Sequence, residues 1–367
     1  MNTKLDRVHI AGFRSLRDLT LDLTPVTVLI GPNGAGKSNL LSALEMIRAI
    51  ASGSLQLFVG ERGGATFLLH YGSKRTAAIT IELTFSTENG HFAYRARLGY
   101  TANDGLIFSE ERVGSRLPPE EWQWSDLGSG HSESRLQPVA HGGDIASTVH
   151  GLLTRIGFYH FHDTSRRSAL RTRDFADLGS DWLRPDGSNL AAFLDGLRGS
   201  EERGDQAAWR LIEGTIRRIA PCVSRITPKR DAHGFRLEWV DDQGETFGPA
   251  HLSDGTLRAI ALIAALGQPA RWRPVVSCID EPELGFHPAA IEILASFISH
   301  VGAFQQVIVS TQSPALIDCF RPSEVVVVER RDGASVFRRL DEAQLAVWLE
   351  DYTLSELYDK NLLGGRP

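Results

Sequence analysis

The sequence GPNGAGKS, residues 31–38, decides the fold. It follows the apolar run Val26 to Ile30 and precedes a segment in which Leu40, Leu44 and Ile47 recur at helical spacing. The glycines of such a loop let backbone N–H groups turn inward on phosphates, the lysine adds positive charge, and the serine hydroxyl can ligate Mg²⁺. The order of strand, glycine-rich loop and helix therefore predicts a P-loop that binds ATP at the edge of an α/β domain.

Within this loop we expect the ATP phosphates to contact a continuous set of residues: Asn33, Gly34, Ala35, Gly36, Lys37, Ser38 and Asn39. Lysine is otherwise found only at positions 4, 74, 229 and 360, so Lys37 stands out in a chain whose positive charge is mostly arginine. The alternative is a glycine-rich turn that only caps a helix. The match of the whole loop in the right strand and helix context favours nucleotide binding instead.

A second run, VVSCIDEP at residues 275–282, is an apolar strand that ends in two carboxylates. Such a strand places Asp280 at the carboxyl edge of the sheet, where it can hold Mg²⁺ through water beside Ser38. Glu281 would then polarise the attacking water as a catalytic base. Acidic residues often end strands, so this run alone is a weak signal, and the P-loop makes the catalytic interpretation the stronger one.

A third run, LSDGTLR at residues 252–258, precedes a helix. Ser253 or Asp254 can serve as the N-cap of that helix, which alone would explain both residues. A serine, Gly255 and a helix N-terminus together also form an anion site. The position of this run shortly before the strand that ends in Asp280 favours the functional interpretation.

The composition of the 367 residues fits a folded globular protein, with 42% hydrophobic and 23% charged residues. The length allows one large α/β domain with an inserted lobe or two modest domains. No apolar run reaches the ~18 residues of a membrane span, and the N-terminus lacks signal-peptide character, so we expect a cytoplasmic protein without a membrane partner. The odd number of cysteines, Cys222, Cys278 and Cys319, argues against a disulfide framework or a zinc site.

The net charge of −6 offers no global attraction to nucleic acid, so DNA binding would need a local basic patch. The segment with Arg166, Arg167, Arg171 and Arg173 is the candidate. A solvated face that pairs with nearby acids is the default interpretation of such a segment. DNA as a partner stays open.

Strand, turn and helix patterns divide the chain into three parts. The first is a P-loop lobe, the second a helical lobe with a small β-hairpin, and the third a lobe that alternates helices and strands. Their expected bounds are 1–165, 166–250 and 251–367. The alternation in the third part predicts a mostly parallel sheet with helices on its faces.

The first part begins with two expected strands, residues 4–13 and 18–30. Three alternating segments follow between residues 76 and 115, separated by Asn-Gly and Asp-Gly turn signals, and predict an antiparallel meander. Residues 116–150 are rich in Gly, Ser and Pro over most of their length, without a period. We expect an exposed loop insert there, pinned by Trp122 and Trp124.

Together these runs resemble a known family. GPNGAGKSN, LSDGTLR, IDEPELGFHP and STQSP occur in the order, and roughly the spacing, of the ATP-binding-cassette (ABC) ATPases of the SMC, RecF and OLD type. The resemblance is strongest to stand-alone bacterial ATPases of that superfamily without a Toprim nuclease domain, and it covers about 1–115 and 153–330. It implies an α/β fold: a P-loop NTPase head of the ABC type with an antiparallel β-meander subdomain, a mixed core sheet and an inserted helical lobe.

In that family two heads close head-to-tail on two ATP molecules, and each signature run contacts the γ-phosphate held by the opposite head. The resemblance thus implies a homodimer in which Ser253 and Gly255 act in trans, with residues 283–288 along the seam. Gln312 stands where many relatives place a switch histidine that touches the γ-phosphate. An amide can donate a hydrogen bond but cannot become cationic, so we expect slow hydrolysis or hydrolysis tuned by a partner.

Two further assignments rest on the resemblance. The loop after the strand-like run at 156–161 should connect the core sheet to the helical lobe. It contains no glutamine, so Asp163 or His162 is assigned to the position next to the nucleotide, Asp163 as a Mg²⁺ ligand. Arg14 and Ser15, just after the first strand, would approach the nucleotide phosphates as in relatives, with ordinary surface roles as the alternative.

The preferred hypothesis is an ATPase that acts as a molecular switch: Mg-ATP closes the homodimer and hydrolysis reopens it. Relatives of the RecF and OLD type work in DNA maintenance or in defence against mobile elements, here with a separate nuclease or other effector as partner. Two alternatives stay open, the ATPase subunit of a membrane transporter and an ATP-binding regulator with little turnover. The signature LSDGT, in place of LSGGQ, points away from transporters.

Overall fold

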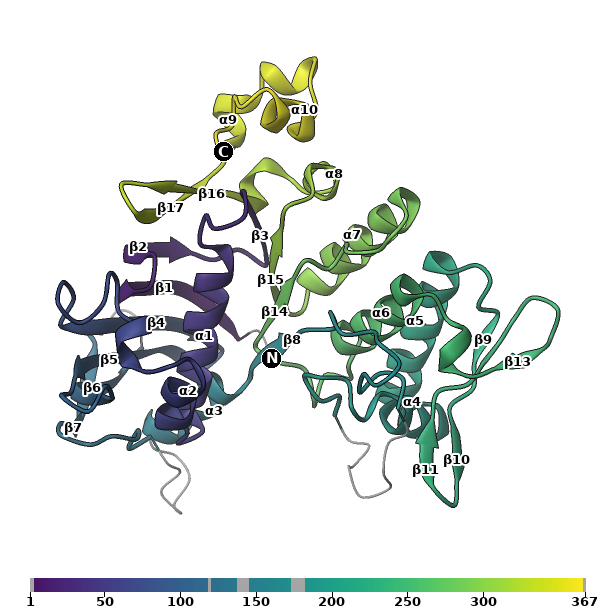
Figure 1. Cartoon of the computed structure of the whole chain (residues 1–367), viewed down its shortest axis with the longest axis horizontal. Coiled ribbons are helices and arrows are strands. Elements are labelled where there is room, and N and C mark those ends of the chain that lie inside the picture. Colours follow the sequence, from purple (N-terminus) through teal and green to yellow (C-terminus); the bar gives the residue numbers. More distant parts are fainter. Residues whose placement is uncertain (1–2, 118–119, 137–144, 173–181, 366–367) are drawn as a thin grey trace.

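Two six-stranded sheets organise the molecule (Figure 1). The computed structural model describes residues 3–117, 120–136, 145–172 and 182–365. One sheet is antiparallel and belongs to the N-terminal lobe, and the other is mostly parallel and lies in the middle of the molecule. A helical lobe with short strands stands on the far side of the parallel sheet, and the C-terminal helices lie at the top of this view.

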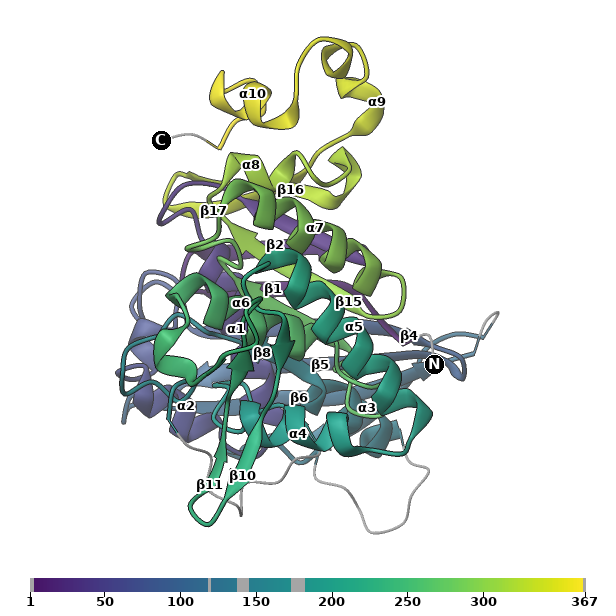
Figure 2. The same ribbon diagram turned by 90° about the vertical axis from the view of Figure 1, so that its right-hand side faces the viewer.

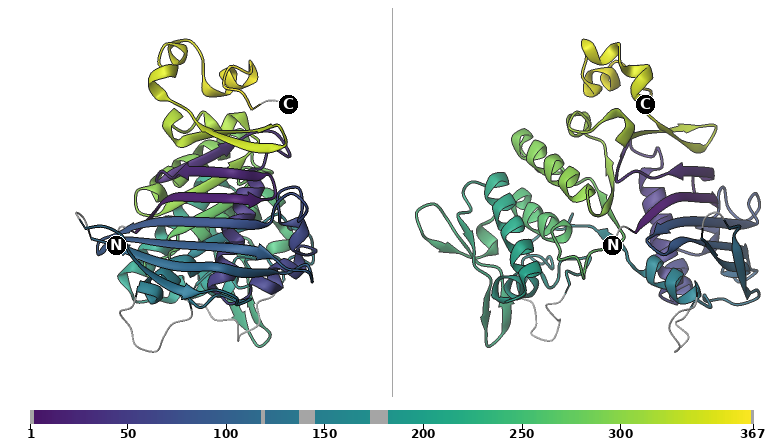
Figure 3. Two further views of the ribbon diagram at one scale, coloured as in Figure 1. Left: turned by 90° about the vertical axis from the view of Figure 1, so that its left-hand side faces the viewer. Right: turned by 180° about the vertical axis from the view of Figure 1, so that it is seen from behind.

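The antiparallel sheet has the strand order β2-β1-β4-β5-β6-β7. Its strands are β1 Lys4–Phe13, β2 Leu16–Asp22, β4 Ala78–Thr87, β5 Gly90–Tyr100, β6 Leu106–Arg116 and β7 Gln123–Gly128. Buried residues alternate with less buried ones along β4, as expected for a sheet with one covered face. The left view of Figure 3 shows these strands in front, with the described helices behind or beside them.

The central sheet has the strand order β17-β16-β3-β15-β14-β8. Its strands are β3 Val26–Ile30, β8 Ile156–Tyr159, β14 Val276–Asp280, β15 Gln306–Thr311, β16 Val325–Arg331 and β17 Ala334–Arg339. All pairings are parallel except that of β16 with β17. Every residue of β3 and of β15 is buried, as in a parallel sheet covered on both faces.

Helices fill the space between and around the sheets. The N-terminal lobe has α1 Lys37–Ala51, α2 Leu55–Glu61 and α3 Ile145–Thr154. Apolar residues of α1 share one core with β1, β4 and the central sheet, so α1 is packed between the two sheets. On the other face lie α4 Leu190–Gly199, α5 Arg203–Ile219, α6 Asp254–Leu266 and α7 Pro288–Gly302. Among the described residues, no helix has the length and apolar character that crossing a bilayer requires.

The helical lobe faces the viewer in Figure 2. Its short strands are β9 Arg225–Ile226, β10 Lys229–Asp231, β11 Gly234–Arg236, β12 Trp239–Val240 and β13 Thr246–Phe247. The C-terminal segment adds three short helices, α8 Pro314–Ile317, α9 Glu342–Leu345 and α10 Leu354–Asp359. Its end is tied to β16, because the Gly365 N–H donates to Glu329 Oε1 at 2.8 Å.

The expected single strand over 18–30 is wrong in one respect, because the structure has two strands there. β2 ends at Asp22, β3 begins at Val26, and the two strands belong to different sheets. Pro25 has no N–H to offer a ladder, and the Thr24 hydroxyl donates to the Val26 carbonyl at 2.5 Å, which bends the chain away. The predicted meander is confirmed: β4 pairs with β5 and β5 with β6, both antiparallel.

The loop insert expected at 116–150 also contains regular structure. Residues 123–128 form the edge strand β7, which pairs with β6, and the start of α3 falls in the same range. The rings of Trp122 and Trp124 lie 5.7 Å apart and both pack over Gly114, where a Cβ would come within 3.2 Å of each. Residues 118–119 and 137–144 of this insert lie outside the described residues.

A buried carboxylate anchors residues 131–135 of the insert. Glu111 on β6 is fully buried and accepts hydrogen bonds from Tyr94 Oη at 2.9 Å, Ser134 Oγ at 2.5 Å and the Arg135 N–H at 3.0 Å. His131 Nε2 lies 2.8 Å from the same carboxylate. Burial raises the pKa of Tyr94 well above its usual range, so its hydroxyl stays a donor. This network gives the insert an anchor that its composition did not predict.

Candidate nucleotide-binding site

The P-loop joins the carboxyl end of β3 to the first turn of α1. Gly34 and Gly36 have φ values of +79° and +115°, a region that favours glycine. A Cβ on Gly36 would lie 1.9 Å from Ser335 Oγ, whereas a Cβ on Gly34 would meet nothing within 4 Å. The loop is therefore closed at its back by β17 and open at its front. There α1 begins, and its N-cap Gly36 supplies no side-chain acceptor for the first N–H groups.

Lys37 is buried within its own loop. It is 5% exposed, and Nζ donates to the carbonyl oxygens of Gly31 at 2.6 Å and Pro32 at 3.2 Å. Burial lowers the pKa of Lys37, and three nearby carboxylates oppose that shift: Asp280, Glu281 and Glu283. Phosphate oxygens are stronger partners for an ammonium group than neutral carbonyls are, so an arriving nucleotide can take over these hydrogen bonds.

Ser38 and Asp280 meet at the front of the loop. Ser38 Oγ lies 3.4 Å from Asp280 Oδ2, although 242 positions separate the two residues in the chain. Two oxygens this close can ligate one Mg²⁺, which commonly takes one or two protein ligands, phosphate oxygens and several waters. Within the described residues, no group of three or more His, Cys, Asp or Glu side chains could hold a metal ion. These two residues thus fit Mg²⁺ that arrives with a nucleotide.

Glu281 follows with an unusual backbone. Its φ is +46°, a rare value for a residue with a Cβ, and its N–H donates to the Ser310 carbonyl at 2.7 Å. A small cavity of about 110 Å³ is lined by Glu281 and Gln312 together with P-loop residues and Asp280. Gln312 Nε2 donates a hydrogen bond to Glu281 Oε1. The Glu281 carboxylate therefore lies in the same cavity as Lys37 and Asp280, and one of its oxygens is engaged by Gln312.

Glu283 lies near the site and acts on Lys37 electrostatically, although among the described residues it does not line the cavity. Burial raises the pKa of Glu283, and the Thr311 hydroxyl donates to its Oε1 at 2.5 Å. Its other oxygen, Oε2, is buried and has no hydrogen-bond partner among the described residues. Packing against the end of β15 brings Glu283 here. The available signal was its place at the start of the segment expected to line the dimer seam.

Ser15 and Asn39 lie behind the P-loop. Asn39 Nδ2 donates to Ser15 Oγ at 2.7 Å, and Ser335 Oγ lies 2.6 Å both from Ser15 Oγ and from the Ala35 carbonyl oxygen. Ser15 is 4% exposed. These contacts join the β1–β2 turn, α1 and β17 behind the glycines, so in this structure the Ser15 hydroxyl supports the loop.

Arg14 has a φ of +46°, and its N–H donates to the Leu68 carbonyl at 2.7 Å. Burial lowers the pKa of Arg14, and so does the positive charge of Arg62, whereas Glu45 opposes both. Arg62 Nη2 lies 2.9 Å from Glu45 Oε2 on α1. Among the described residues, neither Arg14 nor Arg62 lines the cavity at Lys37. The proximity of Arg62 to Arg14 was not expected, because no local motif connects the end of α2 with the β1–β2 turn.

The signature run lies at the start of α6. Ser253 is the N-cap, and its hydroxyl accepts from the Thr256 N–H at 3.1 Å. A Cβ on Gly255 would lie 2.3 Å from the Gly285 carbonyl oxygen, so the helix start approaches the segment after Glu281 very closely. Among the described residues, the lining of the cavity at Lys37 includes neither Ser253 nor Gly255. Ser253 is therefore the N-cap of α6 and is also exposed to solvent.

Arg258 holds this region together from inside. It is 9% exposed, and its guanidinium donates to the carbonyl oxygens of Phe161 at 2.9 Å, of His162 at 3.1 Å and of Leu284. The end of β8, the start of α6 and the segment after β14 are thus joined by one side chain. Arg258 is the last residue of the signature run, but the run itself did not indicate these buried contacts.

The structure does not bring Asp163 to Ser38 and Asp280. Asp163 is exposed, accepts from the Ser165 N–H at 2.9 Å and is absent from the lining of the cavity at Lys37, as far as the described residues go. This hydrogen bond lowers the pKa of Asp163. His162 is exposed as well. The assignment of either residue to the nucleotide site stays a prediction that this conformation does not support.

A family model described as "AAA domain, putative AbiEii toxin, Type IV TA system" matches residues 26–318. The match runs from β3 to α8 and includes the P-loop, the signature run, Asp280 and Gln312. The chain belongs to this family. It is an ABC/SMC-like P-loop ATPase of the RecF and OLD type, as the sequence runs predicted.

Two curated relatives are similar over short stretches and a third over most of this chain. The OLD nuclease of Thermus scotoductus is 41% identical over 54 residues, which is 15% of this chain and 10% of the relative. The DNA replication and repair protein RecF of Parasynechococcus marenigrum is 55% identical over 42 residues, 11% of this chain and 12% of the relative. The Old nuclease of Escherichia phage P2 is 21% identical over 92% of this chain and 61% of its own length. The chain thus spans less than two thirds of each of these relatives.

Solved structures show the fold. An SMC head bound to the C-winged helix domain of ScpA matches with a TM-score of 0.61 and 16% identity, over 93% of this chain and 99% of that chain. An SMC head from Pyrococcus furiosus with an extended coiled coil, bound to the C-terminal domain of ScpA, matches with a TM-score of 0.61 and 15% identity, over 95% and 99%. The expected ABC-type head with a meander subdomain, a mixed core sheet and a helical lobe is confirmed.

Proposed function

We propose that this chain is a Mg²⁺-dependent ATPase that works as a molecular switch, closing head-to-tail as a homodimer on ATP and reopening after hydrolysis. One observation supports this most. The cavity at the front of the P-loop is lined by Lys37, by Ser38 and Asp280, which can hold a cation together, and by the carboxylate of Glu281. Among the described residues, its lining does not include the signature residues Ser253 and Gly255. A hydrolytic site that lacks its signature run is completed by a second copy.

Each residue has a role in this proposal. The P-loop N–H groups and Lys37 bind the β- and γ-phosphates, and Ser38 and Asp280 hold the cation. Bound Mg²⁺ neutralises charge on the phosphates. Glu281 orients water and accepts its proton. Ser253 and Gly255 of a second copy present a helix N-terminus to the γ-phosphate.

A second candidate, an ATP-binding regulator with little turnover, is favoured by the contact between Gln312 and Glu281. The amide occupies one oxygen of the carboxylate that would activate water. In this version ATP closes the dimer, and hydrolysis waits until a partner moves Gln312. The two candidates differ in the basal rate and agree on ATP-dependent dimer formation.

The biological setting belongs to the same proposal. RecF and OLD relatives and the family description of a type IV toxin–antitoxin system support a role in DNA maintenance or in defence against phage, inside the cell, with a separate nuclease or other effector as partner. DNA is a candidate ligand of the switch. No observation on this chain favours a transporter.

The test compares wild type with Lys37→Ala and Glu281→Gln, with Glu292→Gln, an exposed glutamate on α7, as the matched control. Lys37→Ala should weaken ATP binding by about 100-fold, since it removes a charge-assisted partner of the phosphates. Glu281→Gln should keep ATP binding, lower phosphate release by about 100-fold or more, and accumulate an ATP-bound dimer on a sizing column. The control should match wild type in all three measurements.

Two outcomes would contradict the proposal. Unchanged phosphate release by Glu281→Gln would show that Glu281 is not the catalytic base. If the Glu281→Gln protein stays monomeric with saturating Mg-ATP, ATP does not drive dimer formation, even if ATP still binds. A basal rate near zero in wild type that rises when Gln312 is replaced by alanine would select the regulator.

A further inference from the structure

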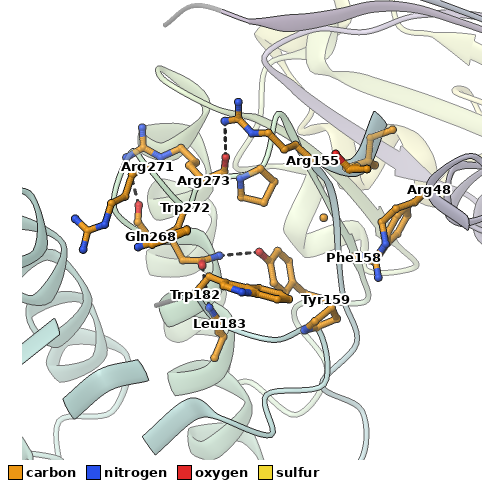
Figure 4. A pocket seen from close by; sticks show the side chains of 15 residues that line it. Arg48, Arg155, Phe158, Tyr159, Trp182, Leu183, Gln268, Arg271, Trp272 and Arg273 are labelled. Atoms are coloured by element: carbon orange, nitrogen blue, oxygen red, sulfur yellow. Dashed lines mark hydrogen bonds between the residues drawn. The ribbon is translucent and has the colours of Figure 1, made fainter. Parts of the chain in front are cut away.

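A second cavity lies at the opposite end of the central strands. It has a volume of about 510 Å³ and is lined by β8 and the residues just before it, by the segment that leads into β14, by Arg48 of α1 and by Trp182 of the helical lobe (Figure 4). It shares no described residue with the cavity at Lys37. We call it the arginine pocket, after the four arginines in its wall: Arg48, Arg155, Arg271 and Arg273.

The charged side chains that line the arginine pocket are all positive among the described residues. Its described lining contains these arginines and no carboxylate. Arg271 is matched by Glu202 and Asp205, each at 2.6 Å. Across the described parts of the chain, no ion pair with a carboxylate is found for Arg48, Arg155 or Arg273. Arg48 is attracted to Glu45, which does not line the cavity. Arg155 and Arg273 therefore carry most of the positive charge that a bound anion would offset.

Neutral acceptors hold these arginines without cancelling their charge. Arg155 Nη2 donates to the Arg273 carbonyl at 2.8 Å, and Arg273 Nη2 to the Gln268 carbonyl at 3.4 Å. Burial lowers the pKa of Arg273, whose guanidinium lies 4.1 Å from the centre of the Phe304 ring. Arg273 Nε and Trp272 Nε1 are buried and have no acceptor among the described residues. This wall thus has more N–H donors than acceptors.

Aromatic side chains form the rest of the wall: Phe158, Tyr159, Trp182 and Trp272. Trp182 is 50% exposed, so part of its ring faces the opening. The rim is fixed by Gln268, which donates to Tyr159 Oη at 2.7 Å and accepts from the Leu183 N–H at 3.1 Å. Flat apolar faces beside guanidinium groups are the combination that binds a base and its phosphate together.

We propose that the arginine pocket binds a nucleotide, with the phosphate held by Arg155 and its neighbouring arginines and the base against Trp182. The cavity volume falls in the range of about 300–1,000 Å³ that ligand sites occupy. The ligand is either a free mononucleotide or the phosphorylated end of a single nucleic-acid strand, since both present the same chemistry. The site is distinct from the ATP site and does not depend on the proposed ATPase switch.

The experiment uses the full chain carrying Lys37→Ala, so that the P-loop does not take up the probe. Calorimetric titrations compare dTMP, dAMP and 5′-phosphorylated (dT)₄ with thymidine and unphosphorylated (dT)₄. At least one phosphorylated probe should bind one to one. Tighter binding of the mononucleotides identifies a free nucleotide as the ligand, and tighter binding of phosphorylated (dT)₄ identifies a strand end.

Arg155→Gln and Trp182→Ala should each weaken that binding by about tenfold, because they remove a charge-assisted phosphate contact and a stacking surface. Both side chains are exposed, so neither change opens the core. Arg97→Gln, an exposed arginine on β5, is the matched control and should leave the affinity unchanged. Normal ATP binding by Arg155→Gln in a chain that keeps Lys37 verifies the fold and separates this test from that of the ATPase.

Three results would overturn the proposal. If no phosphorylated probe binds saturably, the arginine pocket is not a nucleotide site. Equal binding of thymidine and dTMP would show that the arginines do not recognise phosphate. Unchanged affinity in both Arg155→Gln and Trp182→Ala would place the bound nucleotide elsewhere on the protein.

Discussion

The two ends of the central sheet differ in chemistry and in how the chain builds them. At the carboxyl ends of the strands, the cavity at Lys37 takes its glycines, lysine and carboxylates from two short runs within residues 33–39 and 280–281, and adds Gln312 from a third segment. At the amino ends, the arginine pocket takes its residues from four separate segments, at 48, 154–159, 182–185 and 268–274. A site made from backbone geometry is visible in a sequence motif, whereas a site made by packing distant side chains is not.

The sharpest way to separate the two ends is Gly36→Ala. A Cβ there would lie 1.9 Å from Ser335 Oγ at a φ of +115°, so the loop must distort. We expect ATP affinity to fall by about 100-fold or more, while nucleotide binding at the arginine pocket stays the same. Calorimetry with ATP measures the first effect, and calorimetry with dTMP in chains that also carry Lys37→Ala measures the second.

The matched control is Gly60→Ala in α2, where a Cβ would meet nothing within 4 Å and φ is not positive. It should bind ATP like wild type. If Gly36→Ala also binds ATP like wild type, the glycine geometry of the P-loop is not essential. If it loses both ligands, the two ends of the sheet are not independent sites.

Arg258→Gln tests the link between the signature run and the core. The change removes donors to the carbonyl oxygens of Phe161, His162 and Leu284 in a buried place, which should lower the free energy of unfolding by about 2 kcal/mol. ATP binding to the monomer should change little, because Arg258 does not line the P-loop cavity within the described residues. Urea unfolding measures the loss.

Arg210→Gln, an exposed arginine on α5, is the control for Arg258→Gln and should leave unfolding unchanged. Equal stability of the two variants would show that the three carbonyl groups find other donors. A large loss of ATP affinity in Arg258→Gln would show that the signature segment supports the P-loop within one chain.

Glu283→Gln should have the smallest effect, and one that depends on pH. Because burial raises the pKa of Glu283 in the folded state, folding favours its protonated form. That contribution is complete below the ordinary value of 4.5 and is lost as the pH rises through the raised value. The nucleotide-free variant should therefore melt a few degrees higher than wild type at pH 8 and at the same temperature below pH 4.5.

Lys37 works against this effect, because its charge favours the ionised form of Glu283. Glu292→Gln at an exposed position supplies the baseline for the melting curves. A variant with a lower Tm than wild type at pH 8 would mean that the electrostatic attraction between Glu283 and Lys37 outweighs the cost of burial.

Local pattern predicted the P-loop, the meander and the helix that begins at the signature run, because each depends on residues close together in the chain. The break at Pro25 was missed, since the apolar pattern on both sides continues through it. Glu283, Arg62 and Arg258 acquire their positions only when distant segments pack. Glu111 anchors an insert whose Gly- and Ser-rich composition indicated only a loop. Tertiary contacts, which a single sequence does not display, decided all of these.

Three elements extend from one end of the central sheet to the other. α1 starts at Lys37 and carries Arg48 in its last turn, β14 leads from the pocket residue Pro274 to Asp280, and α6 leads from Ser253 to a turn that ends at Gln268. A ligand at either end would therefore contact α1 and a segment joined to β14. Thermodynamic reciprocity then sets a quantitative condition: any factor by which ATP changes the affinity of the arginine pocket for its ligand must equal the factor by which that ligand changes the affinity for ATP.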